Sequence, residues 1–365
     1  MHRRDRTPFL LWLCFLVATV LTSGTPKVAA QITPDTTLGP GNNSVVSPNP
    51  DVLNRSDITG GLRLNSALFH SFQQFNVGNG LQVYFANPSG IQNIFSRITG
   101  GDLSRIDGVL GVAGAANLFL MNPNGIVFGP NARLDVSGSF LATTAKAVEF
   151  SNGQIFAAGG DRAVPLVEVN IPIGLQFGAA PPAVLSSQAN LATGRDLTLA
   201  AGNLDLQGQV QAGGNLTLQA TDTVRIRDTV ATPFLARSGG EMLIQGNQGI
   251  DILALNHLET PFISGRDLSL ISNGMISGDA HFTSGGNLSI QTLTGELGTF
   301  VSLYDPIIRS VGNVTFGTYS GASLKVEAAG SIRATGSINI VRPDLGIAVG
   351  SDPDAAILRG GNALI

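Results

Sequence analysis

The stretch that decides the fold is GRDLTL at residues 194–199, because it returns six times along the second half of the chain. The later copies are GGNLTL at 213–218, GGEMLI at 239–244, GRDLSL at 265–270, GGNLSI at 285–290, VGNVTF at 311–316 and a shortened GSI at 330–332. The first apolar residues of successive copies lie 19, 26, 26, 20, 26 and 18 residues apart. Each copy is a glycine turn followed by alternating apolar and polar residues, which predicts a half-buried strand.

Repeat steps of this length are typical of solenoid proteins. One coil cannot bury its apolar side chains alone, but stacked coils pair strand on strand and align equivalent side chains into a continuous core. Leucine-rich repeats have units of similar size, yet the units here lack their leucine and asparagine spacing and their helical half. The repeat therefore predicts an all-β fold, a parallel β-helix. We expect helix only as a short stretch near residues 139–146, where alanine and threonine cluster.

The composition also fits a protein of many short strands and tight turns. The chain has 365 residues, of which 46 are glycine, 13% are charged and 6% are aromatic. Beyond residue 30 it contains no cysteine, no basic run and two lysines, Lys146 and Lys325. We therefore expect neither disulfide bonds nor a nucleic-acid partner.

The first 30 residues have the pattern of a secretory signal peptide. Three arginines within the first six residues precede an apolar run at residues 9–21, which is too short to span a bilayer. Small residues at 28–30 favour cleavage between Ala30 and Gln31. The alternative is an uncleaved membrane anchor. A lipid on Cys14 is disfavoured because the apolar run continues beyond that cysteine.

The strongest local motif is Asn122-Pro123-Asn124-Gly125-Ile126, which lies between two apolar runs. Pro123 suits the second position of a type I turn, Asn122 can bond back to the backbone from the first position, and Gly125 closes the turn. On this evidence alone the motif is a well-made corner between two strands.

A related motif, Asn87-Pro88-Ser89-Gly90-Ile91, stands upstream, and RITG at residues 97–100 lies between the two. FGPNARLDV at 128–136 and GSFLATT at 138–144 follow. In order and spacing, over roughly residues 32–150, this succession resembles the N-terminal secretion domain of two-partner secretion exoproteins, the filamentous haemagglutinin family.

The resemblance implies a secreted, surface-exposed exoprotein that travels through the periplasm. Its partner would be an outer-membrane transporter barrel with periplasmic docking domains, and the chain would fold outside the cell as a right-handed β-helix. Carried over by position, Asn122, Pro123, Asn124, Gly125 and Ile126 match the family's secretion motif. Whether these residues contact the transporter or help the domain to fold stays open.

The upstream turn supplies a secondary motif, Asn87, Pro88, Gly90 and Ile91, in which Ser89 replaces the second asparagine. The resemblance divides the chain into a signal peptide at 1–30, a secretion domain at 31–185 and a β-helix repeat region at 186–365. The repeat region would be adhesive, with a host-cell or surface carbohydrate or protein as ligand. Family members are generally longer, so the chain is either a fragment or a short exoprotein.

A secreted β-helix polysaccharide lyase or hydrolase is the rival hypothesis. Stacked repeats would align Asp196, Asn215, Glu241, Asp267, Asn287 and Asn313 in one column, where acidic groups could hold calcium or a sugar. The alternative is that these residues favour turn geometry and bond along the stack as a ladder. His70, His257 and His281 share no metal-ligand spacing, so we expect no metal, no cofactor and no catalytic residues.

Overall fold

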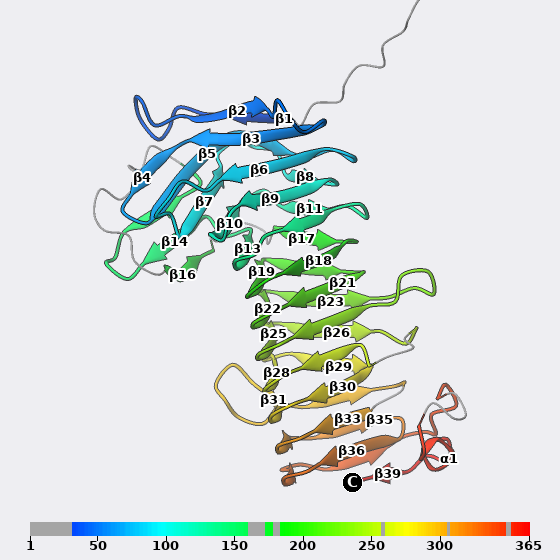
Figure 1. The fold of residues 1–365 in the computed structure, drawn as a ribbon. Helices are drawn as coiled ribbons and strands as arrows, with labels where there is room; N and C mark the ends of the chain where they lie inside the picture. Colours follow the sequence, from blue (N-terminus) through cyan, green and yellow to red (C-terminus); the bar gives the residue numbers. More distant parts are fainter. Residues whose placement is uncertain (1–30, 160–171, 178–182, 257–259, 305–306, 348–351) are drawn as a thin grey trace, which may run out of the picture.

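The computed structural model describes residues 31–159, 172–177, 183–256, 260–304, 307–347 and 352–365. In this part of the chain the strands wind into a parallel β-helix, an elongated stack of coils with the N-terminal strands at one end (Figure 1). Each complete coil of the repeat region contributes one strand to each of three sheets. The all-β, parallel β-helix predicted from the repeat is confirmed.

The first sheet has 13 strands, in the order β1 (Gln31–Pro34), β5 (Ala67–Asn76), β7 (Asn93–Ile98), β10 (Asn117–Met121), β13 (Phe140–Thr143), β19 (Leu197–Ala201), β22 (Leu216–Ala220), β25 (Met242–Gly246), β28 (Leu268–Ile271), β31 (Leu288–Gln291), β34 (Val314–Phe316) and β37 (Ile332–Ala334), with β4 (Leu62–Leu64) beside β5. The second sheet has ten strands, in the order β38 (Ile338–Ile340), β35 (Tyr319–Gly321), β32 (Phe300–Ser302), β29 (Met275–Asp279), β26 (Gly249–Leu253), β23 (Thr223–Arg227), β20 (Asn203–Leu206), β17 (Val184–Ser187), β11 (Ile126–Phe128) and β8 (Ser104–Ile106).

The third sheet has eight strands, in the order β18 (Asn190–Thr193), β21 (Gln209–Ala212), β24 (Leu235–Ser238), β27 (Phe262–Ser264), β30 (His281–Ser284), β33 (Ile307–Ser310), β36 (Leu324–Ala328) and β39 (Ala363–Leu364). A fourth sheet takes its place in the N-terminal coils, in the order β12 (Arg133–Asp135), β9 (Val109–Ala113), β6 (Gln82–Ala86), β3 (Arg55–Gly60) and β2 (Ser44–Pro48). The hairpin sheet consists of β15 (Ile155–Ala157), β14 (Ala147–Phe150) and β16 (Pro172–Gln176).

The repeat copies pair in the register that their alignment predicts. Leu197, Leu216, Met242, Leu268 and Leu288 are successive partners in the first sheet, and Val314 and Ile332 continue the column. From Leu197 to Val314 each of these side chains is at most 1% exposed. Stacked identical positions therefore form the continuous core that a single coil could not bury.

The prediction of a short helix near residues 139–146 is wrong. Residues 140–143 form strand β13, which pairs in parallel with β10 and β19. Phe140 and Ala142 point into the core, so this segment is one more rung of the first sheet, and ladder pairing overrides its local helix propensity. The one helix in the described ranges is α1 (Ala355–Leu358), and it is far too short to cross a membrane.

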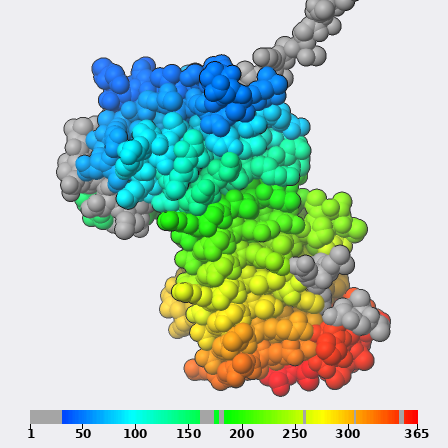
Figure 2. Space-filling view, in the orientation of Figure 1, coloured from blue at the N-terminus to red at the C-terminus, as the bar shows by residue number. Residues whose placement is uncertain are grey.

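Two additions distinguish the N-terminal end from the repeat coils. Antiparallel pairs β2–β3, β4–β5 and β1–β5 cover the first coils; together with the segment between β1 and β2, they are called the cap. The hairpin sheet projects beside the same end of the stack (Figures 1 and 2). Its apolar side packs on the outer face of the first sheet in a second core that contains Phe69, Phe95, Phe150 and Phe156.

Candidate functional site: the turn at residues 122–126

The Asn122–Ile126 motif forms the corner between β10 in the first sheet and β11 in the second. The N–H of Gly125 donates to the carbonyl of Asn122 at 3.1 Å, which closes a β-turn. The N–H of Asn124 donates to the side-chain oxygen of Asn122 at 3.0 Å. Both hydrogen bonds are those that the sequence predicts for this turn.

Asn122 is fully buried, and its contacts join three successive coils. Its Nδ2 donates to the carbonyl of Asp102 and to Oγ of Ser104, each at 3.0 Å, in the preceding coil. Its backbone N–H donates to the carbonyl of Thr143 at 3.0 Å, in the following coil. Because its side-chain oxygen accepts the backbone N–H of Asn124, both polar atoms of the side-chain amide have hydrogen-bond partners within the protein.

The other motif residues differ in exposure. Ile126 is fully buried in the core, and Gly125 adopts a φ of 122°, where an added Cβ would lie 3.0 Å from the carbonyl of Val184. Pro123 is half-buried, and Asn124 is exposed although its Nδ2 donates to the carbonyl of Gly100 at 2.7 Å. Within the motif, Asn124 therefore presents the most accessible side chain.

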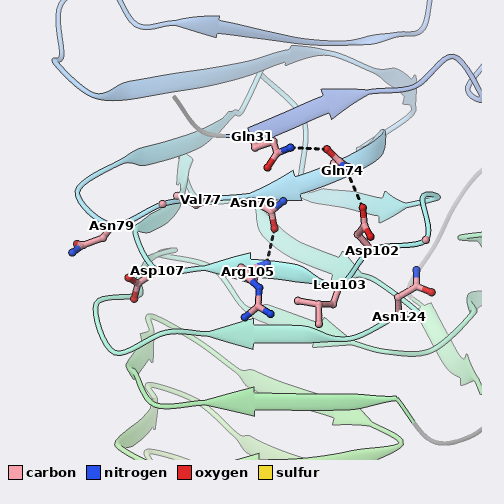
Figure 3. Close-up of a pocket in the computed structure, with 12 residues that line it drawn as sticks. Gln31, Gln74, Asn76, Val77, Asn79, Asp102, Leu103, Arg105, Asp107 and Asn124 are labelled. Carbon is pink, nitrogen blue, oxygen red and sulfur yellow. Dashed lines mark hydrogen bonds between the residues drawn. The ribbon is translucent and has the colours of Figure 1, made fainter. Parts of the chain in front are cut away.

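Asn124 lies between two hollows of the surface. The first cleft, of about 870 Å³, is shown in Figure 3; its polar lining residues are Gln31, Gln74, Asn76, Asn79, Asp102, Arg105, Asp107 and Asn124. The second cleft, of about 530 Å³, includes Pro123, Asn124, Lys146 and Gln176. The exposed side of the motif therefore lies between a polar cleft at the cap and a second cleft beside the hairpin sheet.

The upstream motif forms a different turn at a different corner, between β6 in the fourth sheet and β7 in the first. Here the N–H of Ile91 donates to the carbonyl of Pro88 at 3.1 Å, and Gly90 has a φ of 84°. The turn is therefore shifted by one residue from that at Asn122. The side-chain amide of Asn87 joins two coils. Its nitrogen donates to the carbonyl of Ile91, and its oxygen accepts the backbone N–H groups of Ala115 and Ala116 in the next coil.

Of the two residues at the predicted signal cleavage site, the structure describes Gln31 but not Ala30. Ala30 lies outside the described residues, as does the rest of the predicted signal peptide. Gln31 opens β1, and its Nε2 donates to Oε1 of Gln74 at 3.1 Å on the wall of the first cleft.

Arg97 is the centre of a buried hydrogen-bond network. The sequence does not indicate this role, although Arg97 belongs to the RITG motif that contributes to the family resemblance. Arg97 is 1% exposed and donates to Oγ of Ser71 at 3.0 Å, to the carbonyl of Ala157 at 2.6 Å and to Oγ1 of Thr37 at 2.8 Å. Its guanidinium also lies 4.8 Å from the centre of the Phe156 ring. Arg97 therefore ties together the cap, the first sheet and the hairpin sheet.

Asp35 of the cap completes this network. It accepts hydrogen bonds from Thr37, from Oγ of Ser71 at 2.8 Å and from Oγ1 of Thr99 at 2.6 Å. Burial raises the pKa of Asp35, but these hydrogen bonds outweigh burial and hold the pKa below its ordinary value. Burial lowers the pKa of Arg97, and the charge of Asp35 opposes that change.

Two of the three histidines lie in the described residues, and they belong to strands of different sheets. His70 is fully buried in β5, and its Nδ1 lies 3.0 Å from Oγ of Ser44. Burial lowers the pKa of His70 to about 3. His281 is buried in β30 of the third sheet, and His257 lies outside the described residues.

The acidic and amide column forms a hydrogen-bonded ladder. Side-chain oxygens of Asp196, Asn215, Asp267 and Asn287 each accept the backbone N–H of the column residue in the next coil, at 2.8–2.9 Å. Glu241 interrupts the ladder because it accepts no such bond from Asp267. The column also continues upstream through Asn93, Asn117 and Ser139, which the repeat did not reveal. The part of the chain that the structure describes holds no cluster of three or more metal-ligating side chains.

This chain is similar in sequence to one family of known proteins and to two curated relatives. The family model described as the TPS secretion domain matches residues 30–290. Two heme/hemopexin-binding proteins of Haemophilus influenzae, one from strain Rd, are 33% identical over 72 residues and 34% identical over 73 residues. Each match covers 20% of this chain but only 8% of the relative.

Two crystal structures of secretion domains are similar at low identity. The filamentous hemagglutinin secretion domain is 17% identical, with a TM-score of 0.44 and coverage of 83% of this chain and 99% of that one. The HMW1 secretion domain from Haemophilus influenzae is 16% identical, with a TM-score of 0.43 and coverage of 81% of each chain. None of these comparisons supports the polysaccharide-degrading alternative. Because the family model spans most of the chain, this protein belongs to the TPS secretion domain family, the secretion domains of two-partner secretion exoproteins.

Proposed function

We propose that an outer-membrane transporter barrel recognises this secretion domain through periplasmic docking domains and exports the chain. The route would begin with the signal peptide at residues 1–30, continue through the periplasm and end at the outer cell surface. Family membership and the signal-peptide pattern support this route. In this proposal residues 31–185 are the secretion domain, and residues 186–365 are a surface β-helix that binds a carbohydrate or protein.

The observation that carries the proposal for the motif is the burial of Asn122. Its Nδ2 donates to Asp102 and Ser104 and its Oδ1 accepts from Asn124, so in the folded domain the whole amide holds the corner together. We therefore assign Asn122, Gly125 and Ile126 to forming the β10–β11 corner. Asn124, and to a lesser degree Pro123, keep exposed side chains in the folded domain.

The coil stack supplies the direction of export. Each coil that leaves the transporter can pair with the coil already folded, as Leu216 pairs with Leu197 and Met242 with Leu216. Each leucine buried in this way contributes about 1.5–3 kcal/mol. Folding outside the cell would therefore oppose backward movement of the chain, with the N-terminal coils as the template.

A secretion assay tests the proposal. The full chain is expressed with and without a transporter barrel of this secretion system, and the protein in the medium is compared with that in the periplasm. We expect export to need the barrel, and the Asn122→Ala/Asn124→Ala variant to remain periplasmic. Equal amounts of wild-type protein in the medium without any barrel would contradict the proposal.

Single variants separate folding from contact. Asn122→Ala should reduce both export and thermal stability, because buried partners lose a hydrogen bond that is worth about 1–3 kcal/mol. Asn124→Ala should change stability less, since its side chain is exposed. Asn131→Ala is the matched control, because Asn131 is an exposed turn asparagine whose Nδ2 donates to the carboxylate of Asp107 in the preceding coil. A loss of export in Asn131→Ala equal to that in Asn122→Ala would remove the special role of the motif.

A further inference from the structure

Asparagine followed by glycine is chemically reactive, because the backbone nitrogen of glycine can attack the asparagine side chain without obstruction by a Cβ. The chain contains four such pairs, which begin at Asn79, Asn124, Asn152 and Asn273, and the structure describes all of them. Attack needs a side chain that can rotate and a following N–H that no acceptor holds. The hydrogen bonds of the four pairs therefore decide which one reacts in the folded protein.

The pair in the secretion motif is held on both sides. Nδ2 of Asn124 donates to the carbonyl of Gly100 at 2.7 Å, and the N–H of Gly125 donates to the carbonyl of Asn122 at 3.1 Å. Reaction at Asn124 would first have to break these bonds and open the β10–β11 corner. Folding therefore protects this asparagine.

The pairs at Asn152 and Asn273 are held in the same manner. Their side-chain oxygens accept backbone N–H groups at 3.1 and 3.0 Å. The N–H of Gly153 donates to a backbone carbonyl at 2.8 Å, and that of Gly274 donates to a serine Oγ at 3.0 Å. In both pairs the nucleophile and the side chain are restrained together.

Asn79 is different. It lies in the exposed turn that the N–H of Leu81 closes on the carbonyl of Gly78 at 3.1 Å, and Gly80 has a φ of 75° with open space around it. Among the described residues, neither the Asn79 side chain nor the Gly80 N–H has a hydrogen bond. Figure 3 shows the Asn79 side chain at the end of the cleft, pointing away from the other residues drawn.

We propose that Asn79–Gly80 is a site of spontaneous self-modification in the folded protein. The backbone nitrogen of Gly80 forms a bond to Cγ of Asn79, the bond from Cγ to Nδ2 breaks, and ammonia leaves. The resulting succinimide ring then takes up water at either carbonyl and opens to aspartate or isoaspartate. No oxidant, reductant or enzyme is required.

The product changes the charge of the first cleft. Asp102 and Asp107 already line it together with Arg105, and reaction at Asn79 adds a third carboxylate in place of a neutral amide. A protein that persists outside the cell has time to accumulate this slow change. The charge at this end of the cleft would then become more negative with the age of the molecule.

The experiment incubates the folded full chain at mildly alkaline pH, then digests it and measures aspartate and isoaspartate at all four pairs by mass spectrometry. We expect conversion at Asn79 to be at least about tenfold faster than at Asn124, Asn152 or Asn273. Equal rates at the four pairs, or faster conversion at Asn124, would overturn the proposal.

Two controls separate the role of the fold from that of the local sequence. Unfolding the chain in denaturant should bring the four rates together, because the hydrogen bonds that distinguish them are lost. If Asn79 stays equally favoured in denaturant, the fold does not select it and the proposal is wrong. Asn79→Gln should remove the product at this position while leaving thermal stability unchanged, because the longer side chain closes a ring far more slowly.

Discussion

His70 is a titratable residue whose burial makes stability depend on pH. In the folded protein burial lowers its pKa to about 3, whereas the unfolded chain has the ordinary value of 6.5. Below pH 6.5 the unfolded chain therefore binds a proton that the folded protein does not. We expect the free energy of unfolding to fall by about 1.4 kcal/mol for each pH unit between pH 6 and 4.

Denaturant unfolding at several pH values measures this dependence. His70→Phe should flatten the slope between pH 6 and 4, because the variant has no imidazole to protonate on unfolding. Asp35 and Asp352 also have lowered pKa values, but the stability that they contribute is lost below their ordinary value of 3.8. An unchanged slope in His70→Phe would assign the dependence to other groups.

At the scale of residues, the sequence predicts contacts between near neighbours in the chain and misses contacts between distant ones. The bonds that close the turn at Asn122 join residues two and three positions apart, so residue types and spacing are enough to predict them. Arg97 instead binds Ser71, Thr37 and Ala157, which lie 26, 60 and 60 positions away. Nothing in the neighbouring sequence indicates those partners, and the one local signal is the arginine itself, in the strand NIFSRI.

At the scale of elements, we expect Arg97 to strengthen the attachment of the hairpin sheet, to which it donates through the carbonyl of Ala157. Arg97→Met keeps much of the side-chain volume but removes the hydrogen bonds to the cap and to the carbonyl of Ala157. Because Arg97 donates to neutral groups of Ser71, Thr37 and Ala157, we expect a loss of about 2 kcal/mol. Hydrogen exchange should accelerate in residues 147–157 and leave β22 unaffected. Equal acceleration in β22 would show general unfolding instead.

The ladder offers a second test at this scale. Glu241 is the position at which the column fails to accept the next backbone N–H, that of Asp267. Glu241→Asn supplies a shorter side chain like those of Asn215 and Asn287, and we expect it to raise stability by about 0.5–1 kcal/mol. Thermal unfolding measures this, with the conservative Glu241→Gln as control. A lower melting temperature in Glu241→Asn than in Glu241→Gln would contradict the ladder.

Elements were predictable where the coils repeat and unpredictable where they do not. From Leu197 onward each strand of the first sheet carries the same pattern, so its register follows from alignment alone. The earlier strands β7, β10 and β13 occupy the same sheet, but 57 residues separate Ser139 from Asp196 along the chain. The hairpin sheet lies in that interval and hides the period. Residues 140–143 could therefore be judged only by their local composition, which favoured a helix, although they form strand β13.

At the scale of the whole molecule, a stack of coils should respond locally to damage. Each coil contacts its neighbours, so stability is approximately a sum of coil and interface contributions. Leu118→Ala in β10 and Leu288→Ala in β31 remove equally buried side chains, and each should cost about 2–4 kcal/mol. Hydrogen exchange should then rise in the adjacent coils and fade with distance along the stack. Uniform acceleration throughout the chain in both variants would show a single cooperative unit.

The predicted division at residue 185 belongs to this scale and stays a prediction. The first sheet runs from β13 directly to β19 across that boundary, and one core cluster contains residues on both sides. A sequence shows where a repeat becomes regular. It cannot show whether that point is also a physical boundary, because the same ladder geometry serves irregular coils equally well.

The in-register column from Leu197 to Ile332 has a consequence for how such a molecule can change its length. Coil steps of 18 to 26 residues all preserve the register, since the surplus residues leave the stack as loops between strands. Duplicating one unit, such as residues 197–215, would add a coil and lengthen the rod by about 4.8 Å without disturbing any other contact type. Unequal recombination within the gene could therefore adjust the reach of the protein in small, equal increments.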